Sequence, residues 1–363
     1  MSKTNASQIR MLCPAKLNLF LELCKRRDDG YHDIDTVMVA IDLVDELQIR
    51  VRQQPGISLQ VDWSPSRREL AKQLGVEPSS KAALGPDAHV DPSLAPESAA
   101  SLLDIPCDER NLVWRAAEAA VKHFDLDFGF EITLGKRIPA GAGMGGASSN
   151  AAMTLLAIAT LVGRRGDLDS LHGLAAEIGS DVPFFLRLPP APDPAGTVPA
   201  GTPNVSENSG ASISPVAWAT GRGEVLQPVP IGGRLNFVIV YPAIALSTAR
   251  VYQGATVPDS PISSAPLRNS LKTLAISEIG QFMGNRLTDP ARKIASRIDE
   301  IHESMWQSGL KGVQLTGSGS ASFGIADTPK SAGLAAETLR QQLCPGARVM
   351  TACSLPPPAK TQT

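Results

Sequence analysis

The first fifty residues alternate between apolar and polar positions, the pattern of β-strands that are buried on one face. Residues 11–23 and 34–51 both show this alternation, and the polar stretch 25–33 separates them. Strand-like segments joined by a short polar loop are typical of a hairpin. We therefore expect a hairpin-rich sheet in which the 25–33 loop joins two long strands.

A second region, residues 128–161, combines three patterns in a row. Apolar residues alternate over 128–134 and predict a strand that ends at Ile138. A glycine-rich loop follows, closed by Ser-Ser-Asn at 148–150, and residues 151–161 are helix formers without a breaker. Glycines let a ligand approach the backbone, and the N-terminus of a helix attracts anions. The order strand, glycine loop, helix therefore predicts a phosphate-binding site.

The glycines of this loop leave more than one interpretation open. Gly141, Gly143 and Gly146 fit the dinucleotide-binding pattern G-x-G-x-x-G, but the acidic residue expected about 20 residues further on is missing. Gly, Arg and Arg occupy positions 163–165 instead. A Walker A loop needs a lysine after its last glycine, and the protein-kinase signatures H-R-D and D-F-G are absent. A plain glycine-rich loop before a well-capped helix is the alternative without a ligand.

The remaining pattern divides the chain into two halves near residues 232 and 233. In the first half, Asn111 is expected to cap a helix that extends to residue 124, and another helix is expected at 168–178. In the second half we expect strands at 236–240, 312–316, 321–326 and 348–352, and helices at 270–284, 290–309 and 331–343. This alternation is compatible with a ferredoxin-like sandwich.

Two segments rich in Pro, Ala and Ser, at about 64–106 and 189–215, interrupt these patterns. We interpret them as insertions with the character of solvated loops, with a short helix at 66–74 in the first. The chain from residue 356 onward is expected to be disordered.

Composition narrows the classes of protein. A chain of 363 residues exceeds one typical domain, and 43% hydrophobic residues suffice for a substantial core. The net charge of −2 gives no reason to expect a nucleic-acid or membrane surface. The five cysteines are scattered without a C-x-x-C motif, which indicates free thiols in a reducing compartment. With no membrane-spanning apolar stretch and no signal peptide in residues 1–10, we expect a cytoplasmic protein.

Three motifs carry a resemblance that spans about residues 10–355. They are PAKLNLFL at 14–21, P-x-GxGxGGASSNA at 139–151 and LTGSGSA at 315–321. Together they resemble the GHMP kinase superfamily of small-molecule kinases. The resemblance implies an α+β fold with two domains. A ribosomal protein S5 domain 2-like domain would occupy residues 10–232 and a ferredoxin-like domain residues 233–355.

Two further motifs narrow the resemblance. RDDGYH at 27–32 and GSDVPFF at 179–185 are similar to the branch that acts on a cytidine diphosphate-linked methylerythritol in the non-mevalonate isoprenoid pathway. The implied reaction transfers the γ-phosphoryl group of ATP to the 2-hydroxyl of this small-molecule substrate. ATP is implied as the co-substrate and Mg²⁺ as its metal ion. No nucleic acid or membrane is implied as a partner, and a monomer or a weak homodimer is expected.

The resemblance gives catalytic roles to two residues that look ordinary in isolation. Lys16 alone would be interpreted as an edge lysine, and Asp181 as a turn residue before Pro183. In the family, the residue at the position of Asp181 faces the phosphate-accepting hydroxyl, and Lys16 stabilises the transferred group. Asn18 would help to orient them.

The resemblance also implies the residues that hold the two substrates. Tyr31 and His32, which alone would be surface residues of a polar loop, and Tyr252 would surround the cytosine, because an aromatic face and a fixed hydrogen-bonding group can recognise a pyrimidine. The implied ATP-binding residues are Pro139, Ala140, Gly141, Ala142, Gly143, Met144, Gly145, Gly146, Ala147, Ser148, Ser149, Asn111, Lys136, Gly317, Ser318 and Gly319. Ala142 and Ala147 depart from the family loop, which often has glycine at these positions. Which serine binds Mg²⁺ stays open.

Three alternatives remain at this stage. The chain resembles other GHMP kinases that act on mevalonate, a sugar or homoserine, although the 30–32 loop and Tyr252 favour a cytidyl substrate. A sensor that binds ATP without transfer would be expected to lose Lys16 or Asp181, and both are present. An oxidoreductase that binds NAD is the third alternative.

Overall fold

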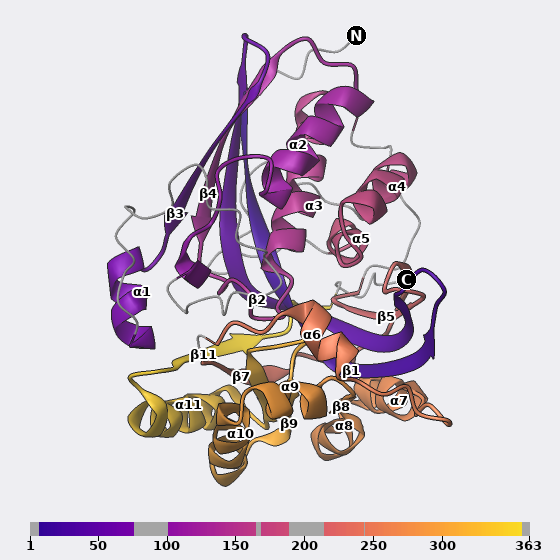
Figure 1. Cartoon of the computed structure of the whole chain (residues 1–363), viewed down its shortest axis with the longest axis vertical. Coiled ribbons are helices and arrows are strands. Elements are labelled where there is room, and N and C mark those ends of the chain that lie inside the picture. Colours follow the sequence, from indigo (N-terminus) through magenta and orange to yellow (C-terminus); the bar gives the residue numbers. More distant parts are fainter. Residues whose placement is uncertain (1–6, 76–100, 165–167, 189–213, 243, 358–363) are drawn as a thin grey trace, which may run out of the picture.

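The structure, a computed structural model, describes residues 7–75, 101–164, 168–188, 214–242 and 244–357. Figure 1 shows two parts that follow one another along the long axis, each built around its own β-sheet. The observed fold is of the α+β class, as predicted.

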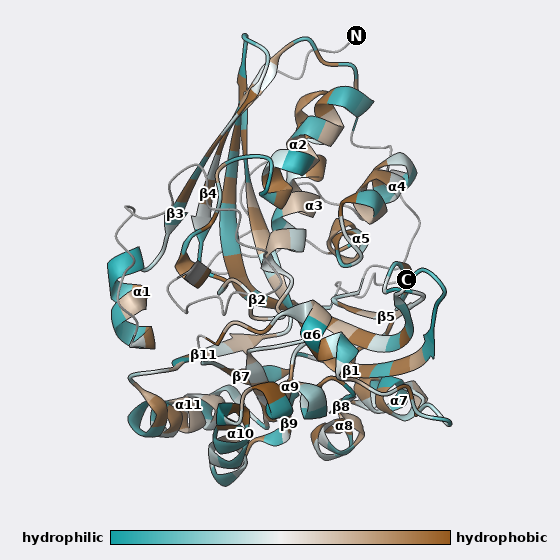
Figure 2. Cartoon of the chain, viewed as in Figure 1, coloured by the Kyte–Doolittle hydropathy of each residue, from teal (hydrophilic) through white to brown (hydrophobic). Residues whose placement is uncertain are grey.

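The predicted hairpin dominates the first part. Strand β1 (Gln8–Arg26) pairs antiparallel with β2 (His32–Arg52) along almost its whole length, and residues 27–31 form the loop between them. The predicted burial of alternate residues holds only toward the far end of β2, over 46–50. Residues 11–23 of β1 and 36–41 of β2 are buried without a break, because two different core clusters cover the two faces of the hairpin there. In Figure 2, brown segments follow these two strands.

The other strands of the first sheet attach to this hairpin. They are β3 (Ile57–Trp63), β4 (Gly129–Lys136), β5 (Val216–Thr220), β6 (Val225–Pro228) and β8 (Gly284–Asn285). Within the described residues the sheet has seven strands, in the order β3-β4-β2-β1-β8, with β5 on β2 and β6 on β5. The two-residue strand β8 comes from the second half of the chain, so it joins the two parts.

Helices α2 (Leu112–His123), α3 (Gly146–Leu161), α4 (Leu168–Ile178) and α5 (Val182–Leu186) lie together beside this sheet (Figure 1). The predicted cap of α2 is confirmed, because the Asn111 side chain accepts a hydrogen bond from the Val113 N–H. The prediction for α4 is confirmed at both ends. Helix α3 is surrounded by core on nearly all sides, which suits its run of alanines.

Two boundaries near the glycine loop were predicted wrongly. Helix α3 begins at Gly146, so residues 148–150 belong to its first turn and do not close the loop, because Gly145 already turns the chain with a left-handed φ of 68°. Strand β4 ends at Lys136 and does not reach Ile138, since the N–H groups of Arg137 and Ile138 donate to the Asp45 side chain.

The second part is the predicted ferredoxin-like sandwich. Its strands are β7 (Asn236–Tyr241), β9 (Lys311–Leu315), β10 (Ser322–Ala326) and β11 (Arg348–Cys353). They form an antiparallel sheet of four described strands in the order β11-β7-β10-β9. Helices α10 (Arg297–Gln307) and α11 (Pro329–Leu343) pack beside it through Ile301, Met305, Ala336 and Leu339. The predicted domain boundary lies just before β7.

Two predicted helices of the second part are each divided into two. Residues 270–284 contain the end of α7 (Ala265–Thr273) and all of α8 (Ile276–Phe282), because Leu274 has a left-handed φ of 55°. Residues 290–309 contain most of α9 (Thr288–Ile294) and all of α10, and the two helices are separated at Ala295, a residue in extended conformation. The short helix α6 (Thr248–Gln253) and strand β3 were not predicted.

The first insertion is described only at its ends. Helix α1 (Arg67–Leu74) is capped by the Ser66 side chain, which confirms the predicted short helix, and residues 101–103 form a 3₁₀ turn. Both pack into a core cluster together with Ile138 and Met144, next to the glycine loop. Residues 76–100, most of the second insertion and residues 358–363 lie outside the described part. Among the described helices, none has the length and apolar character needed to cross a membrane.

Candidate active site

The two glycine-rich motifs lie against each other. The N–H groups of Ser320 and Ala321 donate to the carbonyl oxygens of Gly141 and Ala142, each at 3.2 Å. The Thr316 hydroxyl donates to the Gly143 carbonyl, also at 3.2 Å. A Cβ atom on Gly143 would lie 2.0 Å from the Thr316 carbonyl oxygen, so only glycine permits this approach.

A buried carboxylate supports the start of the glycine loop. Asp45 of β2 is fully buried and accepts hydrogen bonds from the N–H groups of Arg137 and Ile138 at 2.7 and 2.9 Å. Its charge is balanced by the buried Lys136 ammonium, with which it forms an ion pair. Because a buried charge needs a close partner, Lys136 and Asp45 hold each other in place beneath the loop.

The predicted catalytic pair meets on the other side of the loop. Lys16 of β1 is only 3% exposed, and its Nζ lies 3.5 Å from Asp181 Oδ2. The same Nζ donates to Asn18 Oδ1 at 2.5 Å, and the Lys16 N–H donates to the Met144 carbonyl at 2.9 Å. The ammonium is therefore fixed between the Asp181 carboxylate and the glycine loop.

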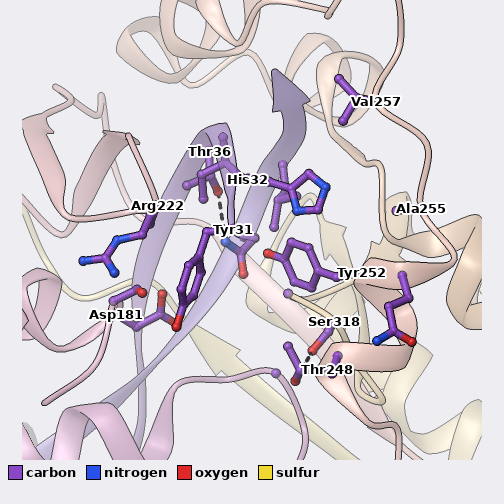
Figure 3. Close-up of a pocket in the computed structure, with 18 of the residues that line it drawn as sticks. Tyr31, His32, Thr36, Asp181, Arg222, Thr248, Tyr252, Ala255, Val257 and Ser318 are labelled. Atoms are coloured by element: carbon purple, nitrogen blue, oxygen red, sulfur yellow. Dashed lines mark hydrogen bonds between the residues drawn. The ribbon is translucent and has the colours of Figure 1, made fainter. Parts of the chain in front are cut away.

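The Asp181 carboxylate is available for chemistry. Asp181 precedes α5, but its side chain makes no capping hydrogen bond to that helix. The buried Phe184 and Phe185 anchor α5, and the Asp181 side chain points into the pocket (Figure 3).

A pocket of about 1070 Å³ extends from this pair between the two parts of the molecule. Tyr31 and His32 come from the β1–β2 loop and β2, and Tyr252 from α6. The rings of His32 and Tyr252 have centroids 5.6 Å apart and are tilted by 34°. The guanidinium of Arg222 lies 5.2 Å from the centre of the Tyr31 ring. Figure 3 shows Tyr31, His32 and Tyr252 grouped in the middle of the pocket, with Asp181 on one side.

The electrostatics keep Tyr252 and His32 neutral. Burial, and next the charge of Asp181, raise the pKa of Tyr252 to about 12. Burial, and next the charge of Arg26, lower the pKa of His32 below its ordinary value. A neutral imidazole has one donor and one acceptor, which is the form suited to recognise a heterocyclic base.

Comparison with known proteins agrees with this geometry. The family model of the GHMP kinases N terminal domain matches residues 111–187, and that of the GHMP kinases C terminal matches residues 268–344. A 4-diphosphocytidyl-2-C-methyl-D-erythritol kinase of Rhodopirellula baltica is 42% identical over 352 residues, which cover 94% of this chain and 95% of that relative. The chain belongs to the GHMP kinases.

Other relatives of this GHMP kinase support the assignment. A 4-diphosphocytidyl-2-C-methyl-D-erythritol kinase of Thermus thermophilus is 31% identical, covering 91% of this chain and 92% of that one. The crystal structure of a 4-(cytidine 5'-diphospho)-2C-methyl-D-erythritol kinase superposes with a TM-score of 0.65 at 29% identity, covering 95% and 99% of the two chains. A homoserine kinase from Cytophaga hutchinsonii, 16% identical with a TM-score of 0.63, shares the fold.

Four of the sixteen predicted ATP-binding residues of the kinase are among the described lining residues of the pocket, namely Gly143, Gly145, Gly317 and Ser318. Residues 139–142, 144 and 146–149 of the glycine loop, Gly319, Asn111 and Lys136 are not. Of the last two, the Asn111 amide is engaged at the N-terminus of α2 and Lys136 pairs with Asp45. The contacts of all sixteen residues with ATP stay a prediction.

Several residues of the GHMP kinase site were not predicted from the sequence. Thr316 joins the third motif to the glycine loop and, through its hydroxyl, accepts from the Asn18 N–H at 3.2 Å. Its place directly before Gly317 was an available signal. Arg222 and Thr248 also line the pocket, and Thr248 bonds to Ser318 through the two hydroxyls at 2.9 Å. No local pattern distinguishes these two residues.

Proposed function

We propose that this GHMP kinase transfers the γ-phosphoryl group of ATP to the 2-hydroxyl of 4-(cytidine 5'-diphospho)-2-C-methyl-D-erythritol, and so forms ADP and the 2-phosphate of this isoprenoid precursor. The observation that carries the proposal is the layout of one pocket. The Lys16–Asp181 pair lies at the glycine loops, and the aromatic group Tyr31, His32 and Tyr252 lies beside it. The names of the relatives, at 42% and 31% identity, support the same reaction.

Phosphoryl transfer requires alignment and neutralisation of charge more than covalent help from the protein. Asp181 accepts the hydrogen bond and then the proton of the attacking hydroxyl. Lys16 is already desolvated and stands 3.5 Å from that carboxylate, so its charge stabilises the negative charge that develops on the phosphoryl oxygens. Asn18 fixes the direction of the ammonium through its 2.5 Å hydrogen bond.

The triphosphate is held by the two glycine loops and the N-terminus of α3. Gly141, Gly143 and Gly145 have left-handed φ angles, which change the direction of successive N–H groups along the loop. The dipole of α3 favours an anion at the N-terminus of the helix, where the loop ends. Gly317 and Ser318 close the site from the second part of the molecule.

The chain fits Mg²⁺ as the metal ion of ATP. No group of three or more His, Cys, Asp or Glu side chains that could hold a metal occurs among the described residues. Mg²⁺ usually needs only one or two protein oxygens when a nucleotide supplies the others. The Ser149 hydroxyl in the first turn of α3 is buried and has no hydrogen-bond partner in the described structure, so it is available as such an oxygen. When bound, the ion would neutralise phosphate charge.

The cytidyl end is recognised by the aromatic group, and Arg222 faces the diphosphate. Tyr31 and Tyr252 supply stacking faces, and His32 supplies a hydrogen bond to the base. Gly223 lies next to Asp181, with its Cβ position 4.0 Å from Oδ1, while Arg222 covers the Tyr31 ring. The turn that carries Arg222 therefore spans the part of the pocket between the acceptor end and the base end. The diphosphate of the substrate lies between these two ends.

The same proposal includes a cytoplasmic enzyme that works as a monomer or a weak homodimer. The proposed substrate-binding residues and the Lys16–Asp181 pair lie around one pocket of a single chain, which supports this part of the proposal. A small, charged substrate is dissolved in the aqueous compartment where ATP is available.

An ADP-release assay with a panel of alcohols tests the proposal. We expect turnover with the diphosphocytidyl substrate and none with mevalonate, homoserine or a hexose, with Asp181→Asn as the blank. Turnover of one of the other alcohols alone would contradict the proposed substrate. ATP binding without any turnover would indicate a sensor, and tight binding of NAD would favour an oxidoreductase.

A further inference from the structure

One wall of the pocket is a segment without regular secondary structure. Residues 254–264, here called the pocket strap, connect α6 to α7, and their residues 255–257 line the pocket directly after Tyr252. Figure 3 shows Ala255 and Val257 on the side of His32 and Tyr252, away from Asp181. A segment with so few backbone hydrogen bonds of its own needs other contacts to keep its position.

Two carboxylates of the long hairpin provide these contacts. Glu22 of β1 and Asp35 of β2 are direct cross-strand partners. The Ser264 N–H donates to Asp35 Oδ2 at 3.0 Å, and the Ile262 N–H donates to Glu22 Oε2 at 3.4 Å. Both carboxylates therefore hold the end of the pocket strap.

Each carboxylate is fixed by a second donor. Opposed like charges on neighbouring strands repel each other, so both need compensation. Arg286, directly after β8, donates to both oxygens of Glu22 at 2.6 and 2.7 Å. Burial works against ionisation of Glu22, but the hydrogen bonds from Arg286 and the Leu23 N–H outweigh it, and the pKa of Glu22 lies below its ordinary value. Asp35 accepts from the Trp218 indole at 2.9 Å.

At the Asp35 end of the strap, Arg268 contacts both residues that donate to Asp35. The Arg268 guanidinium lies 4.0 Å from the centre of the Trp218 ring and donates to the Ser264 hydroxyl at 3.2 Å. Ser264 is fully buried, so its backbone and side chain are both fixed at this point. At the other end of the strap, Ala255 and Val257 pack on a core cluster that contains Leu21 and Leu23 of β1.

We propose that Glu22 and Asp35 are positioning residues for recognition of the cytidyl substrate. They touch none of the reacting groups and are not among the described residues that line the pocket. They fix the pocket strap, and with it the wall that continues from Tyr252 along residues 255–257. The inference rests on the proposed function, because it assigns this wall to the cytidyl end of the substrate.

Steady-state kinetics of Asp35→Asn and Glu22→Gln test the inference. Both carboxylate oxygens of Asp35 accept a hydrogen bond. In Asp35→Asn an NH2 group replaces one of these oxygens, so one hydrogen bond is lost and two donors face each other there. The KM for the cytidyl substrate should rise roughly tenfold in each variant, as expected for the loss of one such bond. The kcat and the KM for ATP should stay within about twofold, and the inhibition constant of cytidine diphosphate should rise with the substrate KM.

Glu46→Gln is the matched control. Glu46 lies on β2, as Asp35 does. Its two carboxylate oxygens accept hydrogen bonds from Arg10 at 2.6 and 2.8 Å, as those of Glu22 do from Arg286, but it is remote from the strap. Its kinetics should equal those of the wild type. All assays are run well below the unfolding temperature of each variant, and Trp218→Phe replaces Glu22→Gln if the latter does not fold.

The outcomes separate this inference from the proposed function. If the wild type does not turn over the cytidyl substrate, the proposed function fails. If the wild type is active but the KM for the cytidyl substrate is unchanged in Asp35→Asn and in Glu22→Gln (or Trp218→Phe in its place), only the inference fails. Equal changes in the KM of both substrates together with a lower kcat would also contradict it, because a general structural defect would then explain the loss.

Discussion

Lys16 is a charged side chain held almost completely inside the protein, and its surroundings explain why it is tolerated there. A buried ammonium is costly unless it is paired and hydrogen-bonded. Asn18 accepts one of its hydrogen bonds at 2.5 Å, and the Asp181 carboxylate lies at 3.5 Å. The charge is therefore already in place in the structure without ligands, and in the proposed mechanism it needs no reorganisation when the phosphoryl group is transferred.

The first prediction concerns this pair. Asp181→Asn keeps the shape of the side chain but removes the base, so kcat should fall by about 10²–10⁴-fold while ATP and substrate still bind. Lys16→Met should lose a similar factor. Because the proposed mechanism has the two groups act on one hydroxyl, the double variant should lose far less than the product of the two factors.

The measurement is single-turnover kinetics of the two single variants and the double variant, with calorimetric binding of each substrate as the control. Full additivity of the two losses would mean that the residues act at separate places. Near-normal turnover of Asp181→Asn would return Asp181 to an ordinary turn residue.

The second prediction concerns the base. Tyr31→Ala and Tyr252→Ala should each weaken binding of the cytidyl substrate by about 1–3 kcal/mol, the usual contribution of stacking a base on an aromatic ring. ATP affinity should stay the same, since the glycine loops bind it. Trp306→Ala removes an aromatic residue of α10 that lies outside the pocket and is about as exposed as Tyr31 (52% against 54%), and it serves as the control in the same titration calorimetry. Parallel losses of ATP and substrate affinity would contradict the assigned roles.

At the scale of elements, the glycine loop is fixed by its neighbours and is not a free flap. The third motif bonds to it at Gly141 and Ala142, and Asp45 supports its start. The Tyr241 hydroxyl donates to the Ala140 carbonyl at 2.9 Å. The loop therefore keeps its shape before a phosphate binds.

Gly143→Ala tests this rigidity. Gly143 has a φ of 74°, and an added Cβ would collide with the Thr316 carbonyl oxygen, so the two loops must move apart. The kcat/KM for ATP should fall on the order of 100-fold, because a displacement of about 1 Å at a reacting centre has such an effect. Gly173→Ala is the control, since Gly173 lies in α4 with free space around it. That change should raise stability by about 0.5–1 kcal/mol and leave activity intact. An active Gly143→Ala enzyme would show that the loops are not held as described.

The elements differ in how far the sequence predicts them. Helix α4 and the cap at Asn111 carry local signals, and the long hairpin carries a period of two, so these were predicted. The left-handed Leu274 that separates α7 from α8 has no glycine or proline to mark it. The early start of α3 depends on Gly145 and on the packing of Gly146 against Ile138, which a helix-propensity argument does not include.

At the scale of the whole molecule, the site forms because the two parts share one core. A single buried cluster contains Leu17 and Val39 of the first sheet together with Phe237 and Phe323 of the second. Strand β8 also pairs with β1 at Phe20 and Leu21, close to Lys16 in the chain. The motifs of both parts are therefore held at a fixed separation.

The sequence predicts which motifs belong to the site but not the contacts that place them. Resemblance alone joined Lys16 to Asp181, and their roles stay a prediction. The Arg222 turn, the Glu22–Arg286 pair and the bond from Ser264 to Asp35 join segments far apart in the chain, so they leave no local pattern. The expected limits of the domains and of the two insertions stay predictions.

A pH prediction follows from a histidine far from the pocket. His302 of α10 bonds to the Ser322 hydroxyl at 2.9 Å, and burial, and next the charge of Arg292, lower its pKa to about 4. An unfolded chain has an ordinary histidine pKa of about 6.5, so between these values the unfolded state binds more protons. The free energy of unfolding should therefore fall as the pH drops from about 6.5 to 4, with a contribution of about 1–3 kcal/mol.

Denaturant unfolding of the wild type and of His302→Gln over this pH range measures the contribution. The difference between the two curves should shrink as the pH falls, because glutamine does not titrate. A constant difference would mean that His302 is protonated equally in both states.

Phosphorus NMR of the product tests the central claim most directly. The purified protein is incubated with ATP and 4-(cytidine 5'-diphospho)-2-C-methyl-D-erythritol until ADP no longer increases. We predict equal amounts of ADP and of a product that keeps its diphosphate and gains one phosphate monoester. Because C2 carries no hydrogen, the new phosphorus resonance should show no splitting by a proton. A doublet or triplet would place the phosphate on another hydroxyl, and ADP formed without a new ester would mean that the chain is not this kinase.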